Sequence, residues 1–112
     1  MKQGEVWRVR IPVTPGHAQF GERPAIIVQD DVFNARLPTV LIVPLTGSQA
    51  ALRFPGTISV APDASNGLTV PSVALAFQLR VLDQSECLKK LGAVDSQTLA
   101  QVLGLIDQVM GR

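Results

Sequence analysis

Short apolar runs separated by proline and glycine make up the first two-thirds of this sequence. Ala25–Gln29 and Thr39–Leu45 are continuous apolar runs, which predict strands that are buried on both faces. Glu5–Ile11 and Val73–Leu82 alternate between larger apolar and other residues, and Gly56–Val60 is a shorter candidate strand. Because proline and glycine interrupt strands and form turns, this part of the chain is predicted to fold as a sheet of short strands.

The last third of the sequence has helical signals instead. Asp83 followed by Glu86 is similar to a capping box, and Gly92 can end the helix that would begin there. Asp95 or Ser96 can cap a second helix, whose apolar residues recur at helical spacing: Leu99, Val102, Leu103, Ile106 and Met110. Strands first and helices last predict an α+β fold, a small and highly curved antiparallel sheet or barrel with a packed C-terminal helix.

The length of 112 residues predicts one domain, residues 1–112. The chain is 46% hydrophobic and only 17% charged, which suggests that an oligomer covers part of its surface. A formal net charge of +1 neither requires nor excludes a nucleic-acid partner. One cysteine and one histidine cannot form a disulfide framework or a standard zinc site, so no metal and no cofactor is expected. No run predicts a signal peptide or a transmembrane helix, so we expect a cytoplasmic protein without membrane contact.

The loop Gly16–Pro24 holds the most suggestive polar residues. Pro24 restricts Arg23 to extended backbone, where the guanidinium can meet a phosphate or, alternatively, anchor the loop through its carbonyls or Glu22. His17 is the only histidine and has the only side chain here that ordinarily titrates near neutral pH. It is either an exposed polar residue or a proton-transfer group.

Polar residues at the ends of two predicted strands are further candidates. Thr46 begins the small polar loop Gly47–Ser48, where its hydroxyl either caps the turn or donates to an anionic transition state. Gln78 and Arg80 lie on the less apolar face of Val73–Leu82 and either line a groove or form an ordinary solvent face, with Arg80 paired to Asp83. Two other arginines, Arg36 and Arg53, are interpreted as solvated surface residues.

In order along the chain, these segments resemble the MazF/PemK family of bacterial toxins. The matching stretches span nearly the whole chain: Gly4-Glu5-Val6-Trp7, Pro15-Gly16-His17 with Gln19, Gly21-Glu22-Arg23-Pro24-Ala25, Phe33-Asn34, Val43-Pro44-Leu45-Thr46, Gly67-Leu68, Ser72-Val73-Ala74, Gln78-Leu79-Arg80 with Asp83, and Lys89-Lys90-Leu91-Gly92. Each stretch alone is a weak signal, whereas their order and spacing together are specific.

The resemblance implies a small SH3-like β-barrel of the PemK type with a C-terminal helix, assembled as a homodimer. Most members of the family are toxins of type II toxin–antitoxin pairs and metal-independent, sequence-selective endoribonucleases. They cut single-stranded mRNA by attack of the ribose 2′-hydroxyl, which leaves a 2′,3′-cyclic phosphate and a 5′-hydroxyl. A cognate antitoxin neutralises them by placing its disordered tail in the RNA groove. Toxins of the same fold that poison DNA gyrase, or that bind RNA or antitoxin without cutting, are the alternatives.

The resemblance also implies roles for single residues. Arg23 would be the main catalytic arginine, Thr46 the hydroxyl that assists it and His17 a proton-transfer group. The surrounding RNA-binding surface would comprise Gln19, Ser48, Gln78 and Arg80. Ala18 and Phe77 depart from the family pattern, because relatives commonly have acidic residues at both positions. Two carboxylates that could share the proton transfer are therefore missing.

Overall fold

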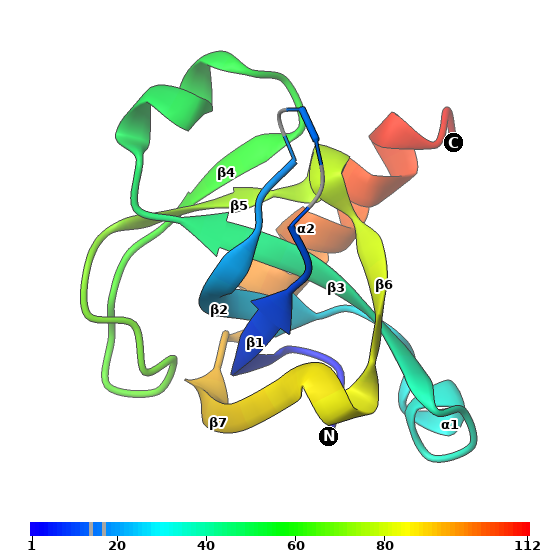
Figure 1. Ribbon diagram of the computed structural model, residues 1–112. Coiled ribbons are helices and arrows are strands. Elements are labelled where there is room, and N and C mark those ends of the chain that lie inside the picture. The colour runs from blue at the N-terminus through cyan, green and yellow to red at the C-terminus, as the bar shows by residue number, and fades with distance from the viewer. Residues whose placement is uncertain (14, 17) are drawn as a thin grey trace.

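The computed structural model describes residues 1–13, 15–16 and 18–112 (Figure 1). Within these residues the strands are β1 (Glu5–Ile11), β2 (Gly21–Ile27), β3 (Thr39–Thr46), β4 (Thr57–Val60), β5 (Ser72–Leu75), β6 (Arg80–Asp83) and β7 (Cys87–Ala93). The α-helices are α1 (Asp31–Asn34) and α2 (Ser96–Val109), and three short 3₁₀ turns are η1 (Gln49–Arg53), η2 (Ala76–Gln78) and η3 (Gln84–Glu86).

The strands pair antiparallel in the order β4-β5-β3-β2-β1-β7, and β6 also pairs with β3. One edge of β3 lies along β2, whereas β6 pairs with the first half of the other edge and β5 with its end. Among the described residues no pairing joins β4 to β7, so the sheet is open rather than a closed barrel. The predicted α+β class, an antiparallel sheet with a C-terminal helix, is confirmed.

Two hydrophobic clusters cover opposite faces of the central strands. The first cluster includes Val6, Ile26 and Val43 together with Val102 and Ile106 of α2. The second cluster consists of Val9, Ile11, Ala25, Ile27, Val40, Ile42 and Leu82. Because successive strand residues point to opposite faces, burial on both faces requires the continuous apolar runs seen in the sequence.

Helix α2 begins where the sequence predicts. Asp95 is its N-cap, and the Asp95 side chain accepts a hydrogen bond of 2.7 Å from the Thr98 N–H. Val102 and Ile106 are buried in the first cluster, as the helical stripe predicts, but Met110 is exposed. In the described part of the chain, no helix is both long and apolar enough to cross a membrane.

The predicted helix over residues 83–92 is wrong. Only the single turn η3 forms, and Asp83 makes no side-chain cap; the chain then continues as β7, which pairs with β1. Gly92 does not end a helix, because it lies in β7, where an added Cβ would collide with the Ser65 carbonyl oxygen. Pairing with the free edge of β1 therefore outweighs a local helix signal.

The prediction of one strand over residues 73–82 is also wrong. The turn η2 divides this segment into β5 and β6, which pair with different parts of β3. The predicted apolar face is not continuous, since Val73 is buried whereas Phe77 and Val81 are exposed. Strand β2 begins at Gly21 rather than Ala25, so Arg23 lies within a strand.

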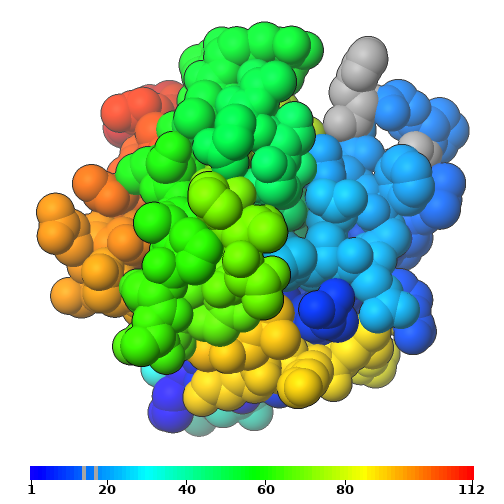
Figure 2. Space-filling model, turned by 90° about the vertical axis from the view of Figure 1, so that its left-hand side faces the viewer, coloured from blue at the N-terminus to red at the C-terminus, as the bar shows by residue number. Residues whose placement is uncertain are grey.

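Several segments meet at one end of the molecule. The turn η1 and the connection from β1 to β2 lie at this end, and α1 lies at the opposite end (Figure 1). The space-filling view shows the same arrangement, with the green segment around η1 and the blue segment leading into β2 at the top (Figure 2).

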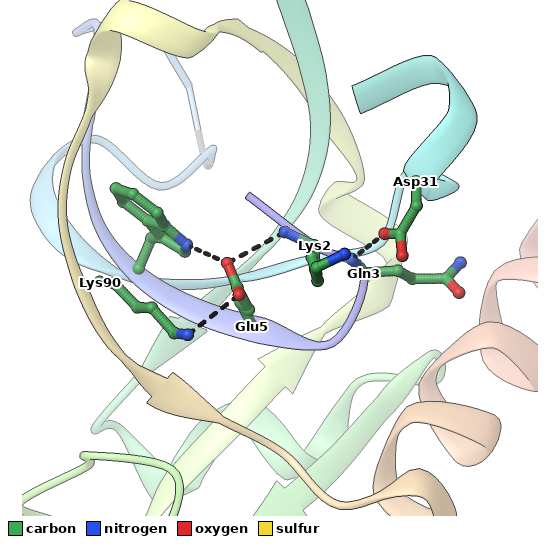
Figure 3. Close-up of polar contacts among 6 residues, drawn as sticks. Lys2, Gln3, Glu5, Asp31 and Lys90 are labelled. Atoms are coloured by element: carbon green, nitrogen blue, oxygen red, sulfur yellow. Dashed lines mark hydrogen bonds and ion pairs between the residues drawn. The ribbon is translucent and has the colours of Figure 1, made fainter. Parts of the chain in front are cut away.

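The side chain of Glu5 on β1 links this strand to the edge strand β7 (Figure 3). This side chain is nearly buried, accepts hydrogen bonds from the Lys2 N–H at 3.0 Å and the Trp7 Nε1–H at 2.9 Å, and lies 3.0 Å from Lys90 Nζ on β7. Burial raises the pKa of Glu5, but the bonds from Trp7 and Lys2 and the Lys90 ammonium outweigh it and hold the pKa below its ordinary value. The motif Gly4-Glu5-Val6-Trp7 thus has a structural role.

Candidate functional site

Strand register sets Arg23 and Thr46 near each other. Arg23 pairs with Val9 of β1, and Ala25 pairs with Pro44 of β3. The β2–β3 register continued by two residues sets Arg23 opposite Thr46, although the two are far apart in the sequence. By strand alternation both side chains lie on the face of the second cluster, at the end of the molecule where η1 lies.

Arg23 is half-buried and fastened to its own loop. The Arg23 Nε–H donates a hydrogen bond of 3.1 Å to the Phe20 carbonyl oxygen. Burial lowers the pKa of the Arg23 guanidinium, which nonetheless stays charged. The guanidinium has five N–H donors, so anchoring the loop through Nε is compatible with binding an anion through the terminal nitrogens.

Thr46 caps the turn that follows β3. Its Oγ1 accepts a hydrogen bond of 3.2 Å from the Ser48 N–H. A hydroxyl both accepts and donates, so this bond leaves the Thr46 proton able to reach a negatively charged oxygen. Ser48 is exposed at the start of η1, and its side chain makes no capping bond there.

Gln19 and Gln78 lie together. The Gln19 N–H donates a hydrogen bond of 2.8 Å to Gln78 Oε1, which ties the β1–β2 connection to η2. Both residues line a groove of about 430 Å³, together with Arg53, Phe54 and Phe77. Two residues predicted as RNA contacts are therefore brought to one place.

Arg80 lies elsewhere than the sequence pattern predicts. It begins β6, pairs with Ile42 and shares the second-cluster face with Leu82, so it does not follow Gln78 along one strand. Arg80 lines a separate groove of about 470 Å³ with Arg10 and Glu86. The ion pairs of the described residues do not include one between Arg80 and Asp83.

The guanidinium of Arg80 contains a buried atom that meets no partner among the described residues. Its Nε has no hydrogen-bond partner within the described part of the chain. An unsatisfied buried N–H is costly, and such groups in native proteins commonly meet a ligand or water. Arg23 and Thr46 lie on the second-cluster face at the end of β3, and Arg80 lies on the same face further back, beside Ile42. Two cations and one hydroxyl on this face form a candidate site for an anion.

Two predicted features have different outcomes. His17 lies outside the described residues. Arg53 is exposed, as interpreted from the sequence, and it also stacks on Phe54, with its guanidinium carbon 4.7 Å from the ring centroid. The sequence could have indicated this contact, because Arg53 and Phe54 are neighbours in the chain. It could not have indicated the contact of Phe54 with Phe77, because these two residues are distant in the sequence.

Comparison with known proteins gives consistent matches. The family described as "PemK-like, MazF-like toxin of type II toxin-antitoxin system" matches residues 2–110. The chain is 34% identical over 113 aligned residues to endoribonuclease PemK of Escherichia coli, covering 98% of this chain and 82% of the relative. It is 29% identical over 111 residues to endoribonuclease MazF of Staphylococcus saprophyticus, covering 99% and 92%.

Solved structures show the same fold. A crystal structure of MazF from Deinococcus radiodurans superimposes with a TM-score of 0.84 at 25% identity, covering 100% of this chain and 97% of the other. A mycobacterial endoribonuclease in complex with its cognate antitoxin superimposes with a TM-score of 0.76 at 23% identity, covering 99% and 95%.

Proposed function

Because the chain belongs to the PemK-like, MazF-like toxins of type II toxin–antitoxin systems, we propose that it is a metal-independent, sequence-selective endoribonuclease that cuts single-stranded mRNA. Two of the relatives similar to it over almost its whole length are endoribonucleases by name. The observation that carries the proposal from family to residues is the placement of Arg23 and Thr46 on one face at the end of β3, with Arg80 on the same face further back along that strand.

The reaction needs little from the protein beyond positioning and charge. The ribose 2′-hydroxyl attacks the adjacent phosphorus, the bond from phosphorus to the 5′-oxygen breaks, and the products are a 2′,3′-cyclic phosphate and a 5′-hydroxyl. The nucleophile belongs to the substrate, so no external water has to be activated. Arg23 donates to the phosphorane oxygens, and the Thr46 hydroxyl adds a further hydrogen bond there.

Arg80 and the polar residues around it hold the RNA. The unsatisfied Nε–H of Arg80 supports contact with an RNA phosphate oxygen. Gln19, Gln78 and Ser48 offer hydrogen bonds to bases and backbone nearby. The protein moves two protons, one from the 2′-hydroxyl and one to the leaving 5′-oxygen. Ala18 and Phe77 cannot carry them, and His17, whose side chain ordinarily titrates near neutral pH, is the proposed proton-transfer residue.

The proposed partners follow from the same site. An antitoxin tail rich in acidic and apolar residues would occupy the region of Arg23 and Arg80 and exclude RNA. A homodimer is proposed because Leu41 and Val81, paired across β3 and β6, are both exposed apolar side chains. We also propose that the whole chain acts as one domain and that the protein works in the cytoplasm, where mRNA is available.

Cleavage-site mapping on a long, sequence-diverse RNA tests the proposal. Purified protein in the presence of EDTA should cut the RNA at a short recurring sequence and leave 2′,3′-cyclic phosphate ends. Arg23→Ala, checked for native folding, should cut far more slowly. A persistent lack of cleavage by the wild-type protein would refute the nuclease function.

A further inference from the structure

The groove between η1 and η2 contains exposed aromatic rings. The chain has only four phenylalanines and one tryptophan, yet Phe54 and Phe77 are 45% and 39% exposed in this one groove. Their ring centroids lie 5.8 Å apart at an interplanar angle of 52°, and the Arg53 guanidinium covers the Phe54 ring. All four phenylalanine side chains are exposed, and Phe54 and Phe77 are the two that come together in this groove.

Backbone hydrogen bonds hold both rings in place. The Phe54 N–H donates to the Ala51 carbonyl at 3.1 Å, and its carbonyl accepts from the Thr57 hydroxyl at 2.8 Å. The Phe77 N–H donates to the Gly56 carbonyl at 3.4 Å. Gly56 has a φ of +76° and lies so close to Phe77 that an added Cβ would come within 3.2 Å of the Phe77 Cβ. The two turns therefore present a preformed surface.

The chemistry of the groove favours a base over a protein side chain. No acidic residue is found among the described residues that line it, and Arg53 gives it positive charge. Its volume of about 430 Å³ lies within the range of sites for small organic groups, about 300–1,000 Å³. Unpaired bases stack on aromatic rings and on guanidinium planes, and amides such as those of Gln19 and Gln78 can bond base edges.

We propose that this aromatic groove, formed by Arg53, Phe54 and Phe77, stacks one unpaired base of the RNA next to the cleaved phosphate. The inference rests on the proposed function, because an RNA must reach Arg23. The bond between Gln19 and Gln78 joins the groove to the segment that leads into Arg23. A strand of RNA that lies on the groove can thus reach Arg23.

Binding of a non-cleavable RNA tests the inference. The probe is a fluorescein-labelled RNA across the mapped cut site with a 2′-deoxy nucleotide at the point of cleavage; if no cut site is found, 12-nucleotide A and U homopolymers replace it. Phe54→Ala should weaken binding about 5- to 150-fold, because stacking on one ring has this effect. The salt dependence should not change, since no phosphate contact is lost.

Matched variants separate stacking from other effects. Phe33→Ala is the control, because Phe33 is 56% exposed on α1 at the opposite end of the molecule, and it should bind RNA as the wild type does. Phe54→Trp should restore binding, whereas Phe54→Leu keeps an apolar side chain and should not. Circular dichroism and thermal unfolding verify that each variant folds. An abasic substitution at the stacked position should weaken wild-type binding without weakening Phe54→Ala further.

The outcomes separate the two proposals. If the wild type cuts RNA and Phe54→Ala binds the probe within twofold of it, the base site is wrong while the nuclease stands. If Phe54→Ala weakens only binding to the antitoxin, the groove docks a protein and the inference also fails. If the wild type binds RNA through Phe54 without cutting it, the base site stands and the nuclease function is wrong. Absence of any RNA binding overturns both.

Discussion

Neutralising Glu5 tests whether the edge of the sheet is held by the contacts in Figure 3. The substitution Glu5→Gln keeps an oxygen that can accept from the Trp7 and Lys2 donors, but it removes the negative charge and the ion pair to Lys90. The side chain of Glu5 is only 9% exposed, so the lost interactions are poorly replaced by water.

The magnitude follows from the contacts. A hydrogen bond to a charged group contributes about 1.5–3 kcal/mol, against about 0.5–1.5 kcal/mol for a neutral one, so each of the two bonds weakens by about 1 kcal/mol. The half-exposed Lys90 adds at most about 0.5 kcal/mol. Relief of the desolvation of the carboxylate offsets part of this loss. We therefore expect Glu5→Gln to lower the free energy of unfolding by about 1–2 kcal/mol.

The pH dependence has a defined sign. The pKa of Glu5 is lowered in the folded state from an ordinary value of 4.5, so the folded protein favours the charged carboxylate. Its contribution is therefore fully present above about pH 4.5 and is lost as the pH falls through the folded-state pKa. The difference between wild type and Glu5→Gln should shrink in acid.

Urea unfolding followed by circular dichroism at fixed protein concentration measures both effects. Asp107→Asn is the control, because Asp107 and Arg112 form an exposed ion pair at the chain end and its loss should change little. Equal stability of Glu5→Gln and wild type at pH 7, or a difference of the same size at pH 3, would refute the reasoning.

Three further changes test the site and the fold. Arg23→Ala should slow RNA cleavage about 100- to 1,000-fold with unchanged unfolding, and an unaltered rate would remove Arg23 from the mechanism. Thr46→Val should slow single-turnover cleavage roughly 10- to 100-fold by removing one donor to a charged group; equal rates would limit Thr46 to capping its turn. Gly92→Ala should lower the free energy of unfolding in urea by about 1–3 kcal/mol, because its Cβ meets backbone. The control Gly104→Ala, on an open face of α2, should instead raise it by about 1 kcal/mol, and a stable Gly92→Ala would contradict the close packing.

Local signals in the sequence identify the elements that depend on local interactions. Glu5–Ile11 is predicted with the bounds that β1 has, because Trp7, Val9 and Ile11 face the second cluster and alternate with the exposed Arg8 and Arg10. The N-cap of α2 is predicted because Asp95 bonds within its own first turn. The helix predicted over residues 83–92 does not form, because pairing with a strand distant in the sequence decides the conformation of most of this segment.

The site depends on contacts between distant residues. No spacing rule sets Arg23 opposite Thr46, since this follows from the pairing of β2 with β3. The sequence singles out each residue by its local setting, but only the family resemblance joins the two in one site. The alternation over residues 73–82 wrongly predicted a single strand. Two strands, β5 and β6, pair with one edge of β3, and the chain must turn between them. Gln78 and Arg80 therefore line different grooves.

Phe77 connects the departure from the family pattern with the aromatic groove. In the sequence, this residue signals only the loss of an acid from a position where relatives commonly have one. In the structure the same residue supplies a ring beside Phe54, and the ring pair could not form if position 77 carried a carboxylate. A carboxylate there would also place negative charge beside the groove that we assign to RNA. On our proposal, position 77 serves base binding in this chain, and the chemistry of cleavage is assigned to Arg23, Thr46 and His17.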